Sequence, residues 1–592
     1  MNGKRTFVTL ALIGLLVLSI TLASHPTFAT LINPTPTFPP LAYLPVIEKQ
    51  TTTAAFSDMQ YGLFEDLGMT DTPDKYQAMI TDLIPRGLDS VLFVNGSIEF
   101  DAPLLDVSDS RNFKTVFSIM GDLYRDWFYN GSVPVDLAAA EHIIGPYVDQ
   151  MKVHPSITGY NLIDDAPPSL KEKMRLAVQI FRDHDPNRPA SPMMVQGLQG
   201  VEVYDYVRPD VFLTYDYPAR NLTQPCDFYG GHPQDFVDTL RNTTQLRPEN
   251  VPLWIVLQTH NTTTGPNDTD PTALRTPTVE EVRLQNWLAL GEEAKGIWWF
   301  IYSTQQTWIG LKDNPTLYAE VTDLAGRVNA LRPILTIAHK LPDKFSVSGG
   351  GYASTLQNPH TRAMYVIVTN QSCSNQNLVV ASDYLSGTLR DMETGLTHHL
   401  GEVISFRGGD GKLFEVVSPI TLTPPTAQPN LVLNGSFETD SNRDGYPDNW
   451  PKVSNVSWDT AVAHTGNASL RIRGPESVTY IYQTPALKPD TRYYLSFWEK
   501  AQGLQESFAG MRYPEILPNP SSLVEIFWKQ NGDYDWTKHL SFFKTPSDFT
   551  QGRLDIVWQL NSGATVWIDD IALCEANKPC VDNYLQERET VP

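Results

Sequence analysis

The sequence predicts a multidomain protein: a (β/α)8 TIM barrel over residues 55–338, a small β-sandwich domain over 339–424 and a C-terminal β jelly-roll domain over 425–578. Its 592 residues are more than one hydrophobic core serves. In the first region eight apolar runs alternate with helix-like segments over roughly 280 residues, the usual size of such a barrel. After Leu335 short strands follow with no intervening helix, and a Thr/Pro hinge, Thr421–Pro429, separates two all-β regions.

Each barrel strand is predicted from an apolar, β-compatible run, and each helix from apolar residues at helical spacing. The predicted barrel strands are Met59–Phe64, Leu88–Val94, Lys114–Ile119, the run from Gly159 to Ile163, Ser191–Val195, Val211–Tyr217, Leu253–Gln258 and Gly296–Tyr302. The predicted helices are Tyr76–Ile84, Ala138–Met151, Ser169–His184, Val279–Ala294 and a last one from about Tyr318 to Leu331.

The two β regions are predicted from alternating apolar and polar residues between turn residues. The strands expected in the first are Lys344–Leu356, Ala363–Thr369, Asn377–Ala381, Gly387–Asp391 and Leu413–Val417. Those expected in the second are Ser469–Ile472, Thr479–Gln483, Tyr493–Glu499, Val524–Trp528, Arg553–Gln559 and Thr565–Ile568.

The N-terminus has the layout of an export signal. Two basic residues precede the apolar run Phe7–Leu22, and small residues follow up to Ala29, so residues 1–29 are predicted to be a signal peptide. The run is short for a spanning helix, which predicts a secreted or extracellular protein, cell surface included, without stable membrane insertion after cleavage. Residues 30–54 form a Pro/Thr-rich linker, and 579–592 a loose tail.

Charge and cysteine content narrow the function classes. The net charge of −23 repels phosphate backbones and argues against a nucleic-acid partner. Four cysteines are too few for a disulfide framework, and their spacing does not suggest zinc. Cys574 and Cys580 can close a small loop, whereas Cys226 and Cys373 can pair across two domains or stay free.

The most informative stretch ends the fourth predicted strand. There an apolar run stops at two adjacent carboxylates, Asp164 and Asp165, and Pro167 and Pro168 end the strand before a helix. In α/β folds the carboxyl ends of the strands hold the active site. We therefore expect the active site at this edge of the barrel.

Several phrases of the barrel region resemble glycoside hydrolases of the large (β/α)8 clan that includes β-galactosidases and cellulases. The phrases are GYNLIDDAP from Gly159, DHDPNRP from Asp183, DVFLTYDYP from Asp210 and EEVRLQNWLALGEEAKGIWWFIYS from Glu280. The resemblance implies hydrolysis of O-glycosyl bonds, which usually needs two carboxyl groups.

The resemblance also implies residue roles. Asp165 stands where the clan has its acid/base glutamate, one methylene shorter, and Asp164 precedes it. The clan's second acid, at the end of strand seven, is replaced by Gln258, which can bind a sugar hydroxyl but cannot attack. The remaining candidates for the second acid are Asp216, ranked first, and then Glu65 or Asp66. The alternative for each of these acids is a structural role at the rim of the barrel, where it would pair with an arginine.

Aromatic residues at strand ends are candidate sugar platforms, because sugar C–H faces pack on flat rings. The set is Tyr217, Trp298, Trp299, Tyr302 and Trp308. Strand alternation allows only one of Trp298 and Trp299 to face inward. The alternative for each is the barrel core, and His260 is either a donor near the barrel mouth or a loop histidine without a role.

The C-terminal region resembles a jelly-roll carbohydrate-binding module. The phrases are NLVLNGSFE from Asn430, TGNASLRI from Thr465, LKPDTRYYLSFWEK from Leu487 and VWIDDIAL from Val566. This resemblance implies a carbohydrate partner. The module's candidate sugar-contacting aromatics are Tyr480, Trp528, Tyr534, Trp536 and Trp558.

One loop of the module has oxygen-bearing side chains at calcium-loop spacing: Asp440, Asn442, Asp444 and Asp448, with Gly445 at the sharp turn. Pro451 takes the place of the EF-hand glutamate, so a calcium-stabilised loop is expected rather than a sensor. The resemblance adds a structural calcium held by Glu438 with Asp569 or Asp570. Metal-free turns are the alternative, and no cofactor is expected for catalysis.

Three functions remain open. The first is a secreted glycoside hydrolase acting on a poly- or oligosaccharide, with its module holding it on the substrate. The second is a non-catalytic carbohydrate-binding or cell-surface protein on a degenerate barrel, motivated by Gln258. The third is an extracellular adhesion protein whose sandwich binds protein.

Overall fold

The computed structural model describes residues 58–576 except 67, 69–71, 245, 249, 264–267, 306–307, 383–384, 418–427, 475–476, 513–524, 531 and 548. The predicted signal peptide (1–29), linker (30–54), tail (579–592) and Cys580 lie outside the described residues, as does most of the predicted hinge. Within the described ranges, none of the helices combines the length and the apolar character needed to cross a membrane.

Eight parallel strands form the predicted barrel. They are β1 (Gln60–Asp66), β2 (Ser90–Val94), β3 (Lys114–Phe117), β4 (Ile157–Asn161), β5 (Ala190–Ser191), β6 (Phe212–Asp216), β7 (Leu253–Gln258) and β8 (Ala294–Phe300). The sheet runs in the order β5-β4-β3-β2-β1-β8-β7-β6, and a parallel bridge between Met194 and Thr214 links its two edges. The (β/α)8 fold predicted from the sequence is confirmed.

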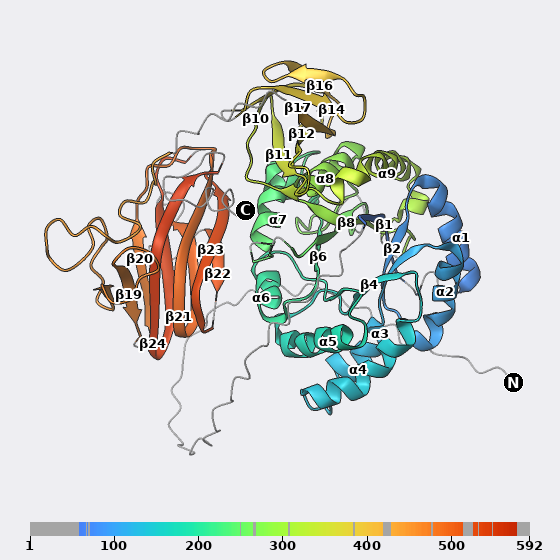
Figure 1. Cartoon of the computed structure of the whole chain (residues 1–592), viewed down its shortest axis with the longest axis horizontal. Helices are drawn as coiled ribbons and strands as arrows, with labels where there is room; N and C mark the ends of the chain where they lie inside the picture. The colour runs from blue at the N-terminus through green and yellow to red at the C-terminus, as the bar shows by residue number, and fades with distance from the viewer. Residues whose placement is uncertain are drawn as a thin grey trace. The chain divides into compact units, whose positions relative to one another are not determined.

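Helices surround these strands (Figure 1). They are α1 (Pro73–Leu83), α2 (Ile98–Arg111), α3 (Met120–Leu123), α4 (Leu137–Met151), α5 (Lys171–His184), α6 (Leu198–Val207), α7 (Gln234–Thr243), α8 (Val279–Gly291) and α9 (Pro315–Leu335). Short turns of other helix types are η1 (Ile84–Arg86), η2 (Tyr124–Phe128), η3 (Pro168–Leu170), η4 (Phe228–Gly230) and η5 (Leu311–Asp313). Several ends follow from local chemistry: Thr278 and Glu281 form a capping box at α8, and Asn314 caps α9 ahead of Pro315.

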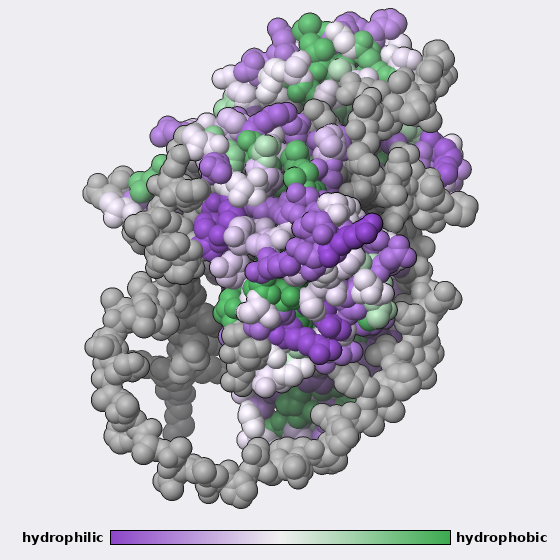
Figure 2. All heavy atoms as spheres, turned by 90° about the vertical axis from the view of Figure 1, so that its left-hand side faces the viewer, coloured by the Kyte–Doolittle hydropathy of each residue, from purple (hydrophilic) through white to green (hydrophobic). Residues whose placement is uncertain are grey.

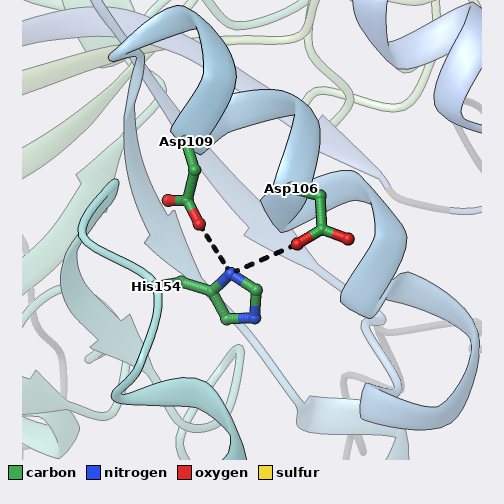
Figure 3. Close-up of side chains that lie close together, drawn as sticks. All are labelled: Asp106, Asp109 and His154. Atoms are coloured by element: carbon green, nitrogen blue, oxygen red, sulfur yellow. Dashed lines mark hydrogen bonds and ion pairs between the residues drawn. The ribbon is translucent and has the colours of Figure 1, made fainter.

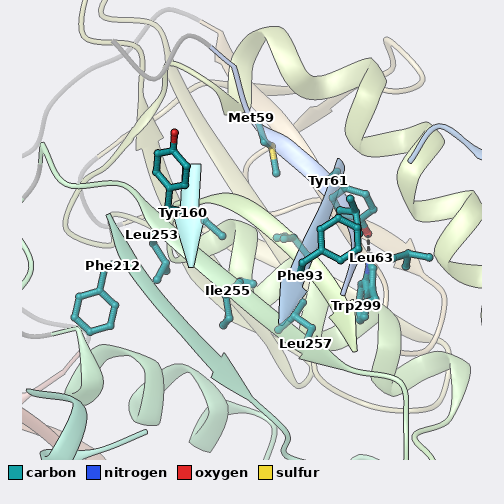
Figure 4. Packing of buried hydrophobic residues seen from close by; sticks show 14 of the residues in the cluster. Met59, Tyr61, Leu63, Phe93, Tyr160, Phe212, Leu253, Ile255, Leu257 and Trp299 are labelled. Carbon is teal, nitrogen blue, oxygen red and sulfur yellow. Dashed lines mark hydrogen bonds between the residues drawn. The ribbon is translucent and has the colours of Figure 1, made fainter. Parts of the chain in front are cut away.

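Alternation along each strand divides the barrel into two cores. On β8, Trp298 and Phe300 belong to an axis-facing cluster, whereas Ile297 and Trp299 pack against the helices. Figure 4 shows the helix-facing packing, in which Trp299 Nε1 donates to the Tyr61 hydroxyl at 3.1 Å. Glycines make room for the large axis-facing rings: a Cβ at Gly296 would lie 2.5 Å from the Trp298 ring.

A small antiparallel β domain follows the barrel. Its strands are β9 (His339–Lys340), β10 (Ser346–Ser348), β11 (Gly351–Gln357), β12 (Met364–Asn370), β13 (Gln376–Ala381), β14 (Thr388–Asp391), β15 (Thr397–His399), β16 (Val403–Phe406) and β17 (Gly411–Val417). They form a six-stranded sheet, β15-β14-β17-β12-β11-β9, and a three-stranded sheet, β10-β13-β16. Apolar residues of both sheets, among them Val366, Leu378 and Ile404, share one buried cluster.

This β domain lies directly on α8. A Cβ at Gly409 would lie 2.0 Å from the Glu280 carbonyl oxygen, and one at Gly411 would lie 2.4 Å from the Trp287 ring, so only glycine permits the contact. Trp287 Nε1 also donates to Asp410 Oδ1 at 3.1 Å. The barrel's helix-facing core continues into β11, β12 and β17 through Leu356, Tyr365, Ile367 and Leu413.

A disulfide fastens the same contact covalently. Cys226, in the segment after β6, is bonded to Cys373, which follows β12, across a sequence separation of 147. The Cys226 N–H donates to Glu281 at the start of α8 at 2.9 Å. Of the two possibilities that the sequence left open for these cysteines, the structure has the bonded one.

The C-terminal strands form an antiparallel sandwich, as the jelly-roll prediction requires. They are β18 (Val456–Asp459), β19 (Ser469–Arg473), β20 (Ser477–Gln483), β21 (Arg492–Arg512), β22 (Glu525–Gln530), β23 (Tyr534–Lys544) and β24 (Arg553–Glu575). The long strands β21 and β24 pair with each other along their lengths, with register shifts between Ser496 and Trp498 and between Gln502 and Glu506. Figure 2, viewed from the left-hand side of Figure 1, shows mostly hydrophilic side chains with smaller hydrophobic patches between them.

An acid lies inside this sandwich. Glu499 of β21 is fully buried and accepts hydrogen bonds from Trp558 Nε1 at 2.5 Å, Ser507 Oγ at 3.1 Å and the Tyr534 hydroxyl. Burial raises its pKa to about 7. Trp558 and Tyr534, both predicted as possible sugar contacts, therefore serve the core of the sandwich.

Candidate functional site

Asp164 and Asp165 lie in the turn between β4 and η3, at the carboxyl end of the barrel. Asp165 adopts a left-handed backbone conformation with φ of 46°, which aspartate tolerates better than most residues. Its N–H donates to Asp164 Oδ1 at 3.0 Å, and the Asp164 N–H contacts Met120 Sδ at 3.0 Å. The turn leaves Asp165 exposed and Asp164 half-buried.

Three tyrosines surround these acids. Tyr215 and Tyr217, on and just after β6, stack with ring centroids 4.9 Å apart, and both are half-buried. The Tyr124 hydroxyl, from η2, donates to the Asp164 carbonyl at 3.4 Å. The site thus combines adjacent carboxylates with aromatic rings from two different barrel segments.

The electrostatics of the site follow from this crowding. Burial, together with the negative charges of Asp165 and Asp66, raises the pKa of Asp164 to about 7. Burial also raises the pKa of Tyr215, with the Asp165 carboxylate beside its hydroxyl adding to the rise. With a pKa near 7, Asp164 is about half protonated at neutral pH and mostly protonated below it, as a general acid requires.

An aromatic series extends from the site toward the loop after β8. Tyr217 meets His260 edge-on at 4.8 Å, His260 lies 4.4 Å from Phe300, and Phe300 lies 5.2 Å from the half-buried Trp308. Burial lowers the pKa of His260 to about 3, so its ring is neutral near pH 7. Its Nδ1 lies 3.2 Å from the Phe300 carbonyl oxygen, so His260 acts as part of the wall beneath Trp308.

The structure does not bring Asp216 together with the acid pair. Asp216 is 1 % exposed, and it accepts hydrogen bonds from Gln196 Nε2 at 2.5 Å and from the Tyr229 hydroxyl. Its neighbours Tyr215 and Tyr217 pack against the axis-facing cluster, and the period of two along a strand turns Asp216 to the other side. Burial raises its pKa to about 7.

At the end of β1 the alternation of side chains also places Glu65 and Asp66 on opposite faces of the strand. Glu65 is fully buried on the helix-facing side, where it accepts from the Ser303 N–H at 2.9 Å, and burial raises its pKa to about 8. Asp66 shares the face of Phe64, an axis-facing residue, and its charge acts on Asp164. Asp66 rather than Glu65 is therefore the β1 acid on the side of the site.

Three residues predicted to bind substrate are committed to the fold instead. Trp298 is fully buried, and its Nε1 donates to Ser90 Oγ at 3.0 Å. Tyr302 is 5 % exposed on the helix-facing side, where its hydroxyl donates to Asp82 at 3.2 Å. Both side chains face a core, and their contact with substrate stays a prediction.

Gln258 is the third residue that was predicted to bind substrate. It is fully buried, and its amide bonds main-chain groups on both sides: Oε1 accepts from the Ala219 N–H at 2.8 Å, while Nε2 donates to carbonyl oxygens of Arg275 at 3.0 Å and His260 at 3.2 Å. Its polar atoms are therefore used in joining the loops after β6 and β7. The prediction that it contacts substrate does not fit this arrangement.

The predicted calcium loop is held by its own hydrogen bonds. Asp440 accepts from the N–H groups of Asp444 at 3.1 Å and Gly445 at 3.0 Å, and Asn442 Oδ1 accepts from the Asp444 N–H at 2.9 Å. Asp448 accepts from the Ser441 N–H at 3.0 Å.

The second predicted set converges on residues 464–468. Glu438 accepts from the Ala468 N–H at 2.9 Å, Asp569 from the His464 N–H at 2.8 Å, and Asp570 lies 2.7 Å from His464 Nδ1. Burial and the neighbouring Asp570 raise the pKa of Asp569 to about 7. Asp569 and Asp570 are thus both held where β24 passes the loop of residues 464–468.

One cluster outside the predictions has side-chain atoms close enough to share a cation: Asp106 and Asp109 on α2, with His154 before β4 (Figure 3). His154 Nδ1 lies 2.8 Å from Asp109 and 3.9 Å from Asp106. Asp109 also accepts from the Ser156 N–H at 2.9 Å. These contacts tie the end of α2 to the entry of β4, at the barrel end opposite the site.

Sequence reasoning missed Tyr124 and the neighbouring Tyr129, whose rings meet edge-on at 5.1 Å. Tyr129 is 62 % exposed. Tyr124 lies in, and Tyr129 directly follows, a helical segment, α3 to η2, that was not predicted. The apolar residues Leu123, Trp127 and Phe128 at near-helical spacing were the available signal.

No protein-family model matches this sequence, and no curated protein matches it. A glycoside hydrolase family 5 structure from Bacteroides vulgatus is 11% identical, with a TM-score of 0.40, over 60% of this chain and 89% of that chain. A β-galactosidase from the psychrophilic Marinomonas ef1 is 14% identical, with a TM-score of 0.35, over 46% of this chain and 60% of that chain. A family 16 carbohydrate-binding module is 27% identical, with a TM-score of 0.21, over 25% of this chain and all of that one. The chain is thus similar to solved glycoside hydrolase barrels and carbohydrate-binding modules.

Proposed function

We propose that this protein is a secreted glycoside hydrolase that acts on a poly- or oligosaccharide. The observation that carries the proposal is the pair Asp164–Asp165 at the carboxyl end of β4, flanked by the half-buried rings of Tyr215 and Tyr217. Sugars bind where flat apolar surfaces adjoin polar groups, and this site offers both.

In the proposed reaction Asp164 donates its proton to the glycosidic oxygen, since its raised pKa leaves a large fraction of it protonated up to about pH 7. A second carboxylate, Asp165 or Asp66, attacks the anomeric carbon or activates water. The Tyr217 ring packs on the sugar face, and the buried wall of His260 and Phe300 behind it limits the access of water. These roles replace the sequence-based ranking, in which Asp165 was the acid and Asp216 its partner.

The C-terminal sandwich is proposed to hold the enzyme on its substrate. Tyr480 of β20 is 41 % exposed, and the Arg553 guanidinium lies 4.3 Å from the centre of the neighbouring Tyr482 ring. Aromatic rings beside a fork of hydrogen-bond donors suit sugar binding. Tethering raises the local substrate concentration without altering the barrel's chemistry.

Calcium in this module stays a proposal. Glu438, Asp569 and Asp570 supply hard oxygen atoms around residues 464–468. The hydrogen-bonded Asp440–Asp448 loop is the other candidate. Thermal unfolding with calcium and with a chelator tests it: binding raises the melting temperature in a concentration-dependent way, and unchanged melting refutes it.

Activity on a panel of glycosides tests the hydrolase proposal. Asp164→Asn keeps the shape of the side chain but cannot deliver a proton, so turnover should fall by about a hundredfold or more. Asp183→Asn is the matched control, because Asp183 is an exposed acid on α5 outside the site. Equal activity of both variants and the wild type on a cleaved glycoside would refute the assignment.

A non-catalytic carbohydrate-binding protein is the second candidate. It is favoured by Gln258, which occupies the place of the clan's second acid and is fully engaged with main-chain groups. Glycan-array binding that requires Tyr217, without release of reducing ends from any bound glycan, would support this candidate over the hydrolase.

A further inference from the structure

The acids of the barrel site form an excess of negative charge. Asp66, Asp164 and Asp165 influence one another, yet none of them forms an ion pair within the part of the chain that the structure describes. The nearby Arg220 instead lies over the ring of Tyr229, 5.7 Å from its centroid. With Asp164 protonated as the proton donor, Asp66 and Asp165 remain as two carboxylates without a cation, which is costly unless a ligand supplies positive charge.

Aromatic rings lie beside these acids. Tyr124, Tyr215 and Tyr217 border the acids, and all three are half-buried. The faces of aromatic rings attract ammonium groups, and this attraction is stronger where water is partly excluded. Aromatic rings alone would serve a neutral sugar equally well, so the acids decide the charge of the ligand.

An unpartnered acceptor points to a ligand independently of the acids. Asn161 ends β4, is 1 % exposed, and donates through Nδ2 to the Phe93 carbonyl at 3.3 Å, while its Oδ1 has no partner in the described structure. It shares the axis-facing side of β4 with Gly159, where a Cβ would meet the Trp254 ring at 2.7 Å. A buried carbonyl oxygen without a donor is destabilising by about 1–3 kcal/mol, and an N–H or O–H from a ligand relieves that cost.

A single metal ion does not fit this site. Among the described residues, the acids and histidines whose ligand atoms converge within 4.8 Å are those around His154, not Asp66, Asp164 and Asp165. The three carboxylates are therefore too dispersed to coordinate one ion. They suit a larger ligand that carries several donors along its length.

We propose that the barrel site takes a cationic carbohydrate, a chain of amino sugars with free ammonium groups, bound between the acids Asp66, Asp164 and Asp165 and the rings of Tyr124, Tyr215 and Tyr217. The inference rests on the proposed function and specifies its substrate class. Asp66 acts as a specificity-determining residue that recognises an ammonium group. Asp164 remains the proton donor, and Asp165 is then the second carboxylate of the proposed reaction.

Binding by the full chain tests this, measured calorimetrically with two probes that differ only in charge. One is a short β-1,4-linked glucosamine oligomer, and the other is its fully N-acetylated counterpart, both at about pH 6, where the free amines are protonated. We expect tighter binding of the cationic oligomer. Asp66→Asn should weaken that binding about fivefold and leave the acetylated oligomer unaffected, because one partly screened charge pair is lost. Asp183→Asn, with the same change of net charge outside the site, should bind as the wild type does.

The outcomes separate the two proposals. If the acetylated oligomer binds as tightly as the cationic one, or if Asp66→Asn and Asp183→Asn behave alike, the cationic-substrate inference falls while the hydrolase proposal stands. If the chain neither binds nor cleaves any glycan, both fall. A preference for the cationic oligomer that weakens as salt is raised, and that disappears in Asp66→Asn, supports the inference.

Discussion

Removing the Cys226–Cys373 disulfide tests the join between the barrel and the adjoining β domain. The bond spans a sequence separation of 147, for which loop-closure entropy gives about 5 kcal/mol at 25 °C as an upper value. The glycine contacts on α8 hold the same two segments together without the bond, so we expect about 3 kcal/mol. Over a cooperative unit of roughly 350 residues, that corresponds to a melting temperature about 4 °C lower.

Differential scanning calorimetry of Cys226→Ser, Cys373→Ser and the double variant measures the effect. Because either substitution removes the same bond, the two single variants and the double variant should melt at the same reduced temperature. A reductant should likewise lower the melting temperature of the wild type. Melting of the double variant within a degree of the wild type would refute the reasoning, as would additive losses from the two single variants.

Three further predictions concern protonation and packing. The activity of the wild type should fall as pH rises above about 7, where Asp164 loses its proton, and a pH–rate profile of Asp164→Asn should lack that descending limb. Because the pKa of Glu499 is raised, its contribution to stability is complete at low pH and is lost as pH rises through about 7. Glu499→Gln should therefore flatten the dependence of the sandwich's melting temperature on pH. An unchanged slope would contradict this prediction. Trp298→Ala should cost about 3–5 kcal/mol in denaturant titrations by opening the axis-facing core, whereas Tyr217→Ala should weaken glycan binding with a smaller loss of stability.

The sequence was sufficient for the barrel strands because buried parallel strands are continuous apolar runs, as in Leu253–Gln258. Helices were harder to predict from the sequence. Pro103 lies inside α2 and its apolar residues keep no single face, so the pattern gave no helix there. The fifth strand is only Ala190–Ser191, because Pro192 has no N–H to donate and interrupts the regular pairing before the bridge at Met194.

The site was predicted only to the level of the strand end. Alternation indicates that neighbouring residues face opposite sides, but it does not say which side is which when both sides are apolar. Leu63 and Phe64 are equally hydrophobic, so Glu65 could not be told from Asp66; for the same reason Asp216 was chosen over its tyrosine neighbours. Tyr124 was out of reach because it comes from a separate segment, and only tertiary folding brings it to Asp164.

The way Gly409 and Gly411 rest on α8 sets where the chain tolerates truncation. A fragment cut after α9 would expose the ring of Trp287 to solvent and would remove Leu356, Tyr365 and Leu413 from the barrel's own core. The smallest piece that folds should therefore extend to Val417, the end of β17. Transferring the eight-stranded barrel alone to another protein would therefore yield an insoluble product.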